Sequence, residues 1–347
     1  MTTSLTLEAP RRLAFHREAD ADLQPDQVRL RTLFSGISAG TELSQYRGTS
    51  PFMHRRFDDD RRLFVASQTP SWPFPVTNLG YEEVGEIVEV GASVEGLSVG
   101  QHVFGTWNHR THHVAAATYA RERLMPPGAN PRIGIFSHIG SVALNGVHDA
   151  GLRIGDTVAV WGLGVPGQIV CQAARASGAR VIAVDPDPER RRIAVTHGAT
   201  IALDPSGGGA AEAIKDLTGG MGADACIEVS GAAPALSDAI RAVAYSSRVV
   251  AMGFFQGEVA GLRLGEEFHH NRVALICSQI SGTAPEASHR WNKPRLWRTA
   301  VELQHAGTLD LLPLITDVAP FAEAPALFER LDRAESGITQ TMLQFGS

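Results

Sequence analysis

Residues Asp156–Arg191 read "DTVAVWGLGVPGQIVCQAARASGARVIAVDPDPERR", and this stretch decides the fold. A short apolar strand runs directly into Gly162-x-Gly164-x-x-Gly167, which opens a helix, and a second apolar strand ends at Asp185. Gly162 permits a tight turn, Gly164 lets a pyrophosphate approach the backbone, and Gly167 lets the helix pack on the strand. Since the helix N-terminus then faces the phosphates, the stretch predicts a dinucleotide-binding βαβ unit.

The acid at the end of the second strand indicates which dinucleotide binds. Asp185 is placed to accept hydrogen bonds from the adenosine ribose hydroxyls and to repel a 2′-phosphate, which favours NAD over NADP. We also expect cofactor contacts from Val165 and Pro166 in the loop, and from Arg190 and Ser230 farther along the chain. Arg190 begins an arginine triplet inside a helix, where a solvated face is the alternative interpretation.

Strand–helix alternation continues on both sides of this unit and predicts an α/β fold with a parallel sheet covered on both faces. The predicted helices span residues 133–150, 168–177, 188–197, 235–244, 295–306 and 324–333, and strands lie at 222–231, 246–253, 273–280 and 338–346. The first 125 residues read instead as short strands and turns with the rhythm of a small barrel. They are interrupted by a long surface excursion over Tyr46–Trp72.

Composition narrows the class of protein. The 347 residues suffice for two domains, and they are 44% apolar and 20% charged with a net charge of −6. That mild acidity gives no reason to expect nucleic acid or an anionic membrane as a partner. Cys171, Cys226 and Cys277 each lie in apolar runs and form no C-x-x-C motif, so we expect buried free thiols. Because we find no leader segment and no apolar run of about 18 residues, we expect a cytoplasmic location.

Four motifs in order resemble the medium-chain dehydrogenase/reductase superfamily, which includes the zinc-type alcohol dehydrogenases. They are "FSGISAGTELSQYRG", "LGYEEVGEIVEVG", "GLGVPGQ" and "ELQHAGTLDLLPLIT". The resemblance implies a GroES-like β-barrel catalytic domain built from residues 1–150 and 291–347, with a Rossmann NAD-binding domain over 151–290. It also places Asn145 where the family has a residue lining the nicotinamide.

Departures from the family's pattern concern its catalytic zinc. The resemblance places the three ligand positions at Ser38 (or Ala39), Tyr81 and Ser141, and none of these offers a thiolate, imidazole or carboxylate. The four-cysteine structural lobe is also missing, since Gly100–Leu124 contains no cysteine. We therefore expect no metal. The histidines at 102, 109, 112 and 113 lack ligand spacing, and we interpret them as surface or packing residues.

A site without zinc needs another way to handle the alcohol proton, and the motif positions suggest which residues supply it. Thr41 matches the family's proton-relaying hydroxyl, Tyr81 replaces a ligand, and Glu82 is the acid beside that ligand. We take these three as the catalytic candidates, with His54 in the long excursion as a remoter one. A space-filling aromatic at Tyr81 and a structural acid at Glu82 remain open alternatives.

Three functions stay open at this point. The first is a zinc-independent, NAD-dependent dehydrogenase of a secondary alcohol (a polyol, a sugar derivative or a natural product), because "GISAGTE" and "ALNGVHDAG" resemble the zinc-lacking branch that includes bacteriochlorophyllide hydroxyethyl dehydrogenase. The second is an NAD(P)H-dependent quinone or enone reductase, against which Asp185 argues. The third is a non-catalytic nucleotide-binding protein.

The strand at Val273–Ile280 ("VALICSQI") is apolar on both faces and closes the predicted strand order. An apolar edge strand invites pairing, and relatives commonly join two nucleotide domains edge to edge. We expect a homodimer or homotetramer through this strand. The alternative is a monomer whose segment 281–294 folds back over the edge.

Overall fold

The computed structural model describes residues 1–66, 69–333 and 337–346. Its contacts divide the chain into two compact units, Met1–His138 with Leu312–Ser347, and Ile139–Leu311. The expected domains ended at residues 150 and 290 instead. The difference arises because helices α3 (Ser137–Ala150) and α8 (Lys293–His305) fall almost wholly within the second unit. Where the functional domains divide stays a prediction.

The second unit is a six-stranded parallel sheet in the order β11-β10-β9-β12-β13-β14. Its strands are β9 Thr157–Trp161, β10 Arg180–Val184, β11 Ile201–Leu203, β12 Ala223–Glu228, β13 Val243–Ala251 and β14 Ala274–Cys277. Its helices, besides α3 and α8, are α4 Val165–Ala176, α5 Pro188–His197, α6 Ala210–Leu217 and α7 Ala233–Ala242. The α/β fold class with a Rossmann sheet is confirmed.

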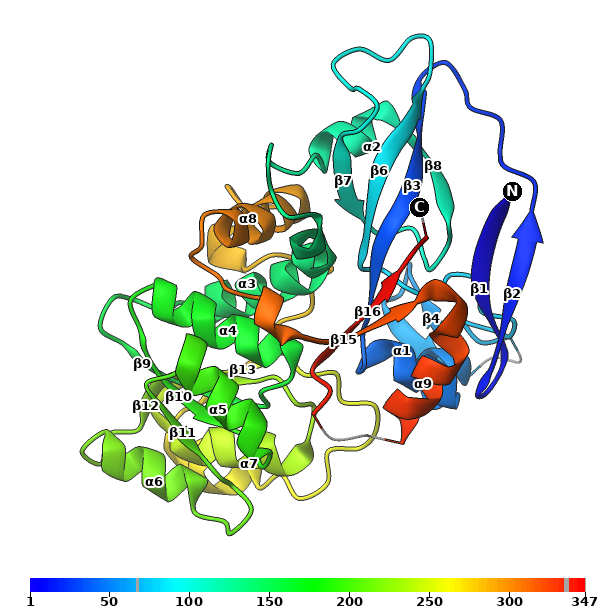
Figure 1. The fold of residues 1–347 in the computed structure, drawn as a ribbon. Helices are drawn as coiled ribbons and strands as arrows, with labels where there is room; N and C mark the ends of the chain where they lie inside the picture. The colour runs from blue at the N-terminus through cyan, green and yellow to red at the C-terminus, as the bar shows by residue number, and fades with distance from the viewer. Residues whose placement is uncertain (67–68, 334–336, 347) are drawn as a thin grey trace. The chain divides into compact units, whose positions relative to one another are not determined.

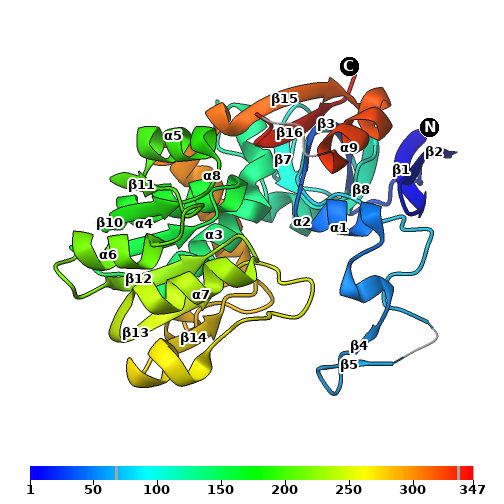
Figure 2. The same cartoon turned by 90° about the horizontal axis from the view of Figure 1, so that it is seen from below.

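Crossover direction explains why both faces of this sheet are buried. From β9 the chain moves to β10 and β11, and then returns to β12 on the other side of β9. Because such crossovers are right-handed, α4 and α5 cover one face while α6 and α7 cover the other (Figure 2). The order reverses between β9 and β12, and ligands bind at such a switch point in open α/β sheets.

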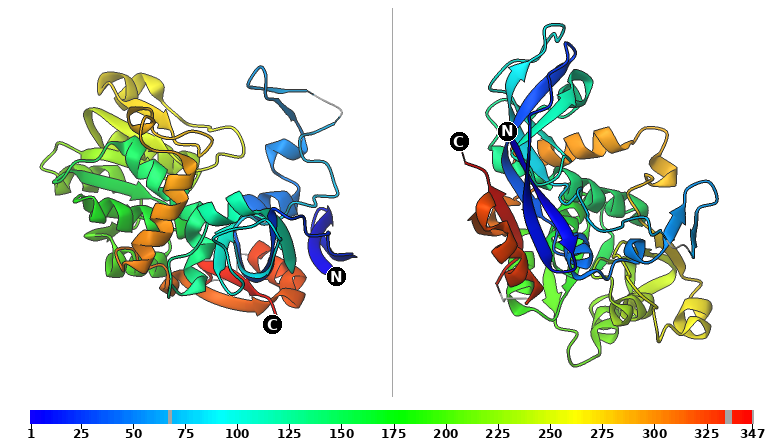
Figure 3. Two further views of the ribbon diagram at one scale, coloured as in Figure 1. Left: turned by 90° about the horizontal axis from the view of Figure 1, so that it is seen from above. Right: turned by 90° about the vertical axis from the view of Figure 1, so that its right-hand side faces the viewer.

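The first unit is built from both ends of the chain around a curved sheet. Its strands run in the order β15-β16-β3-β6-β7, and β8 also pairs with β3. Figures 1 and 3 show the strands curving round a common interior, as the barrel expectation required. The strands of this sheet are β3 Gln27–Ile37, β6 Glu83–Val90, β7 His102–Gly105, β8 His112–Ala116, β15 Ile315–Pro320 and β16 Gln340–Gln344.

Smaller elements complete this unit. The hairpin β1–β2 (Thr2–Ala9 and Arg12–Glu18) stands beside the sheet. Helix α1 (Thr41–Arg47) packs on α9 (Ala324–Asp332), and α2 spans Ala117–Glu122. The long excursion contains a 3₁₀ turn at Pro51–Met53 and a short hairpin, β4 Arg56–Asp58 with β5 Leu63–Val65; residues 67–68 of it lie outside the described residues. Further 3₁₀ turns lie at Pro131–Phe136, Leu312–Leu314 and Phe321–Glu323.

Three predicted helices begin earlier than expected, and proline is the common reason. The expected starts at residues 168, 235 and 295 each follow a proline, which the sequence pattern treats as a break. In the structure α4, α7 and α8 carry that proline within their first two residues. A helix tolerates proline there because those amide positions have no intrahelical acceptor.

The edge strand differs from expectation in one respect. Cys171 and Cys226 are buried as expected, but Cys277 is exposed, and so is Leu275 on the same strand. Both residues lie on β14, which has a neighbour on one side only. Among the described residues, no helix combines the length and apolar character that crossing a membrane requires.

Candidate active site

The glycine loop of the second unit has the geometry that its sequence predicts. Gly162 has φ +87°, and a side chain there would meet the Ser230 Cβ at 2.7 Å. A Cβ on Gly167 would overlap the carbonyl oxygen of Gly162, whereas one on Gly164 would find only Pro166 Cδ, 4.0 Å away. Gly162 and Gly167 are thus required by the protein's own packing. Gly164, which caps α4 ahead of Val165 and Pro166, leaves open space instead.

Asp185 is buried at the end of β10, and both of its carboxylate oxygens accept a backbone hydrogen bond. Oδ2 accepts from Leu163 N at 2.7 Å and Oδ1 from Asp187 N at 2.8 Å. An ionised carboxylate has about four acceptor sites, so capacity for two ribose hydroxyls remains. The arginine that contacts this strand end is Arg191, which donates to Asp185 O at 2.6 Å.

A second acid lies at the end of β12, on the other side of β9 from β10, and was not among the predicted residues. Glu228 ends β12, is fully buried, and accepts hydrogen bonds from the Ser230 amide and hydroxyl and from Gly231 N. Burial raises the pKa of Glu228, although these hydrogen bonds oppose the shift. The sequence feature that could have identified Glu228 is an acid at the end of an apolar strand, in "ADACIEV". Glu228 holds the turn that carries Ser230 against Gly162.

Asn145 lies on α3, and its amide is occupied by the second unit itself. Nδ2 lies 3.2 Å from Asp149 Oδ2 and 3.3 Å from Gly282 O, and Oδ1 accepts from Ala284 N at 3.2 Å. These contacts tie α3 to the segment that follows β14. The contact of Asn145 with a nicotinamide stays a prediction.

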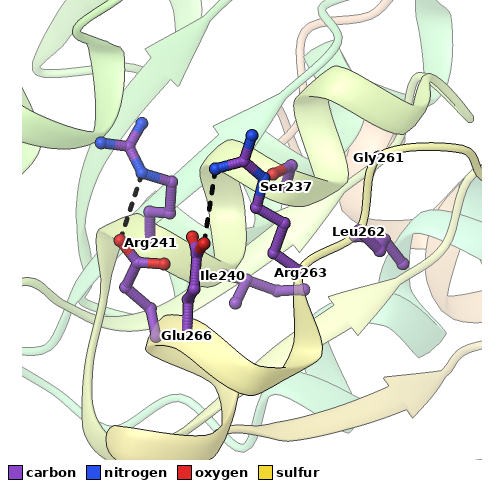
Figure 4. Close-up of a pocket in the computed structure, with 8 residues that line it drawn as sticks. Ser237, Ile240, Arg241, Gly261, Leu262, Arg263 and Glu266 are labelled. Carbon is purple, nitrogen blue, oxygen red and sulfur yellow. Dashed lines mark hydrogen bonds and ion pairs between the residues drawn. The ribbon is translucent and has the colours of Figure 1, made fainter.

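A surface hollow of about 440 Å³ lies between α7 and the short helical turn Leu264–Phe268 (Figure 4). Its charged side chains neutralise one another: Arg241 lies 3.5 Å from Glu267, and Arg263 lies 3.3 Å from Glu266. A hollow whose cations and anions are already paired offers little to a charged ligand. We do not assign the active site to it.

The three predicted hydroxyl residues of the first unit come together in the structure. Ser38 lies in the connection between β3 and α1, Thr41 is the first residue of α1, and Tyr81 lies two residues before β6. All three are partly exposed. Burial raises the pKa of Tyr81, the neighbouring carboxyl groups of Glu82 and Glu42 add to the shift, and hydrogen bonding with Ser38 and Thr41 opposes it. Tyr81 is therefore a neutral phenol near pH 7.

Glu82 lies behind these hydroxyls and is buried. Its Oε2 is 3.5 Å from Gln340 Nε2, and a side chain on Gly36 would overlap it. Burial raises the pKa of Glu82 well above its usual range, and the charges of Glu42 and Glu83 act in the same direction. The raised pKa favours the protonated form of Glu82, and the side chain does not itself reach the surface.

Two more buried acids and a histidine extend this layer. Glu42 Oε2 lies 2.8 Å from His109 Nε2, and His109 Nδ1 lies 2.7 Å from Ser35 Oγ. Ser35 in turn donates to Glu83 Oε1 at 3.0 Å. The sequence pattern placed His109 among surface or packing residues, whereas it is buried and bonded to two polar partners. Only the fold brings residues 35, 42, 83 and 109 together.

His138 was also missed, and its ring lies 5.0 Å from that of Tyr81 in an edge-on arrangement. His138 is on α3, one turn before Ser141. Its place one turn from a family ligand position could have identified it as a site residue from the sequence. His54, the remoter candidate, bonds the Gly48 carbonyl at 2.7 Å and is exposed.

The donor set does not fit a catalytic zinc. Ser38 offers a hydroxyl and Tyr81 a neutral phenol, and no group of three His, Cys, Asp or Glu side chains in the described part of the chain could hold a metal. Zinc sites in proteins use thiolate, imidazole or carboxylate ligands. We therefore derive no step through a metal.

The loop geometry predicts opposite effects for two glycine-to-alanine variants. G167A should lower Tm by several degrees, because the new Cβ overlaps backbone and overpacking costs about 1–3 kcal/mol. G164A should leave Tm nearly unchanged but weaken NADH binding, since its Cβ enters the open space beside the helix N-terminus. Thermal unfolding and NADH fluorescence titration measure both effects. Equal losses of stability in the two variants would contradict this division of roles.

The raised pKa of the buried Glu83 leads us to predict that the free energy of unfolding depends on pH. Burial raises the pKa of Glu83 to about 7 against the charge of His109. The folded chain then binds this proton more tightly than the unfolded chain does. The protonated Glu83 therefore contributes to the free energy of unfolding at low pH, and this contribution is lost as pH rises from about 4.5 to 7. The shift corresponds to on the order of 3 kcal/mol. Relative to E83Q, the wild type should therefore lose unfolding free energy between pH 4.5 and pH 8.

Denaturant unfolding of both proteins at the two pH values measures this difference. E86Q is the matched control, because Glu86 lies on the same strand but pairs with Arg31 at 2.6 Å in a partly exposed position. If E83Q loses as much unfolding free energy between the two pH values as the wild type does, Glu83 is not the source of the pH dependence.

Comparisons with known proteins agree with this architecture. Residues 24–143 match the alcohol dehydrogenase GroES-like domain, and residues 166–293 match the zinc-binding dehydrogenase family. D-guloside 3-dehydrogenase of Escherichia coli (strain K12) is 35% identical over 326 residues, which cover 92% of this chain and 93% of that protein. (R,R)-butanediol dehydrogenase of Bacillus subtilis is 29% identical over 286 residues, covering 75% of this chain and 77% of that protein.

Solved structures show the same fold. The structure of 2R,3R-butanediol dehydrogenase from Bacillus subtilis superimposes with a TM-score of 0.79 at 21% identity and covers 99% of both chains. A zinc-binding-dehydrogenase structure from Sinorhizobium meliloti bound to NADP has the same score at 23% identity and the same coverage. With both domain models in order and a 35% identical relative over nearly its whole length, the chain belongs to the medium-chain dehydrogenase/reductase superfamily and is an oxidoreductase of the alcohol dehydrogenase type.

Proposed function

We propose that the protein is a zinc-independent dehydrogenase that transfers hydride between a secondary hydroxyl of a sugar-derived substrate and NAD. The observation that carries the proposal is the Tyr81 hydroxyl, which hydrogen-bonds with Ser38, at another of the family's ligand positions, and with Thr41, at the position of its proton-relaying hydroxyl. A polar, partly exposed hydroxyl group backed by buried acids suits proton transfer to or from a substrate oxygen. It does not suit a protein that only senses nucleotides.

The substrate class rests on the relatives. D-guloside 3-dehydrogenase, by its name, oxidises position 3 of a sugar glycoside, and it matches 92% of this chain. The butanediol dehydrogenase relative also acts on a secondary alcohol by its name. Hydroxyl-rich surroundings of the kind formed by Ser38, Thr41 and Tyr81 supply donors and acceptors for neighbouring sugar hydroxyls.

Without a metal, the proton has to be handled by side chains. Zinc can lower the pKa of a bound hydroxyl from about 16 to about 7, which corresponds to on the order of 12 kcal/mol. NAD, when bound, supplies the hydride acceptor. Burial raises the pKa of Tyr81 and of Glu82, which favours their protonated forms and so suits donation of a proton to a carbonyl oxygen. We infer that Tyr81 contacts the reacting oxygen and that the buried Glu82 acts behind it as a positioning residue.

The preference for NAD is inferred from Asp185. Its carboxylate is fixed by two backbone amides close to Gly162, and a 2′-phosphate beside a fixed carboxylate would be repelled. Glu228, at the end of β12 on the other side of β9, adds a further acid at the same edge of the sheet. The NADP in the Sinorhizobium meliloti structure belongs to a protein only 23% identical to this chain.

A glycoside panel tests the proposed function. The purified protein is given methyl glycosides of several hexoses, D-gulosides included, with NAD or NADP, and reduced cofactor is followed by absorbance. We expect oxidation with NAD in the presence of a chelator, with zinc well below one atom per chain by elemental analysis. Preference for NADP, or activity that disappears with the metal, would overturn the corresponding part of the proposal. Oxidation of quinols or reduction of enones alone would favour the reductase alternative.

Substitutions separate the roles of the two candidate proton groups. Y81F should lower kcat by about 10²–10⁴-fold, the usual contribution of a general acid or base, with NAD affinity nearly intact. E82Q keeps a neutral hydrogen-bonding group in the same volume, so a positioning role predicts a smaller loss. Steady-state kinetics with NADH titration measures both. If both variants keep turnover within about threefold of wild type, neither residue handles the proton.

We further propose that two chains pair through β14. The strand is the sheet edge, and Ala274, Leu275 and Cys277 on it are exposed in the single chain. An exposed apolar edge is an aggregation hazard unless another strand pairs with it, and a two-fold axis along the edge would continue the sheet.

Cys277 reports on this pairing, since the other two cysteines are buried. Light scattering at micromolar concentration should give at least the mass of two chains, and Cys277 should react slowly with a thiol reagent. C277S identifies the reacting thiol. The mass of one chain together with a fast-reacting Cys277 would refute the dimer.

A further inference from the structure

One buried histidine links the two segments that carry the hydroxyl residues. His109 Nε2 lies 2.8 Å from Glu42 Oε2 on α1, and Nδ1 lies 2.7 Å from Ser35 Oγ on β3. Ser35 is itself 3.0 Å from Glu83 Oε1 on β6. Neither the nucleotide loop nor the proposed proton transfer explains why four ionisable or polar groups are buried together here.

The same imidazole packs against the backbone that leads into Tyr81. Gly80 has φ +97° and directly precedes Tyr81, and a Cβ on it would lie 2.7 Å from His109 Nδ1. The backbone amide of His109 donates to Leu79 O at 2.9 Å. His109 therefore fixes both the path of Leu79–Gly80 and the direction in which Tyr81 leaves it.

On its other side the imidazole acts through Glu42. That carboxylate accepts the Ser38 amide at 2.9 Å on Oε1 while Oε2 faces His109. Glu42 also follows Thr41 directly in the first turn of α1. Removing the bond to His109 would leave the buried Glu42 side chain without this hydrogen-bond partner, which is costly.

We consider two ways of placing the protons along the hydrogen-bonded chain from Glu83 through Ser35 to His109. In the first, Ser35 donates to an ionised Glu83, so His109 Nδ1–H must donate to Ser35, and Nε2–H donates to Glu42; the imidazole is then a cation. In the second, a protonated Glu83 donates to Ser35, Ser35 donates to a bare Nδ1, and the imidazole is neutral. The two differ only by one proton moved across the Ser35 hydroxyl.

The surroundings favour sharing of that proton. The ionisable groups facing His109 are Glu42 from α1 and Glu83 from β6, while α9 presents the ring of Phe328 at 6.2 Å. Glu82 lies near both carboxylates. Burial alone would lower the pKa of His109, but Glu42 and Glu83 raise it overall.

We propose that His109 is a positioning residue, which shares one proton with Glu83 through Ser35 and holds Tyr81, Ser38 and Thr41 in register through Gly80 and Glu42. The role of those hydroxyls in catalysis rests on the proposed function, whereas the coupling of His109 to Tyr81 does not. The charge of His109 is thereby transmitted to the hydroxyl group at the surface.

NMR tests the coupling without any substrate. Protein carrying ¹⁵N-histidine and ¹³C-tyrosine is titrated between pH 5 and pH 9, with Tyr81 assigned by its loss in Y81F and His109 by its loss in H109Q. We expect the Tyr81 ring resonance to move with the same midpoint as the His109 ring nitrogens. H109Q, which keeps hydrogen-bonding groups but not the charge, should abolish that movement. H112Q is the matched control, because His112 lies on β8 outside the cluster and should leave it unchanged.

S35A supplies a second, smaller change in case H109Q does not fold. It removes the hydroxyl between His109 and Glu83, so the His109 midpoint should move while Tyr81 continues to follow it. A Tyr81 resonance with the same pH curve in H109Q as in wild type would overturn the proposal. A His109 midpoint that S35A leaves in place would do the same, because no proton would then be shared.

Kinetics provides an independent readout once a glycoside is found that the wild type oxidises. H109Q should lower kcat by about 10-fold or more with KM within about threefold, as for partners that orient a functional group. If the wild type oxidises none of the glycosides, the proposed function fails, and the NMR result still decides the coupling.

Discussion

The structure of the first unit depends on the pairing of His109 with Glu42 in a place that water does not reach. An isolated buried charge costs several kcal/mol, so such a group is either paired or neutralised. Here both solutions occur within one cluster. Glu42 takes the imidazole as its partner, while burial raises the pKa of Glu82 well above its usual range and that of Glu83 to about 7. The start of α1 and the segment entering β6 are positioned by these contacts.

The same cluster gives physical meaning to the residues at the family's metal positions. A zinc ion would bring positive charge next to Glu82 and Glu42. In its place the chain has hydroxyls in front and buried carboxyls behind. Burial disfavours the charged forms of Tyr81 and Glu82 and raises the pKa of both. Under the proposed function, such a site would polarise a substrate oxygen by donating hydrogen bonds to it.

The nucleotide unit is determined by close backbone approaches. Gly162 lies against Ser230, and Gly167 lies against the Gly162 carbonyl, so the loop, the start of α4 and the turn after β12 form one packed group. Asp185 and Glu228 then fix the loop and that turn by accepting backbone amides. Because the strand order reverses between β9 and β12, these groups gather at one edge of the sheet.

The sequence by itself determined the Rossmann unit, because glycine spacing and apolar runs act locally and leave a direct signature. The family, and the barrel built from both chain ends that it implies, came from the resemblance of four motifs. It also placed Ser38, Thr41, Tyr81 and Glu82 by motif. The sequence pattern placed three helix starts after a proline. It did not reveal that each proline lies in the first turn of its helix, where the missing N–H costs no intrahelical hydrogen bond. It took Cys277 as buried, because an apolar run does not reveal that its strand is the edge. Only the tertiary structure joined Ser35, Glu42, Glu83 and His109, because their contacts link positions up to 74 residues apart, and burial and proton sharing depend on what surrounds a side chain rather than on its neighbours in sequence.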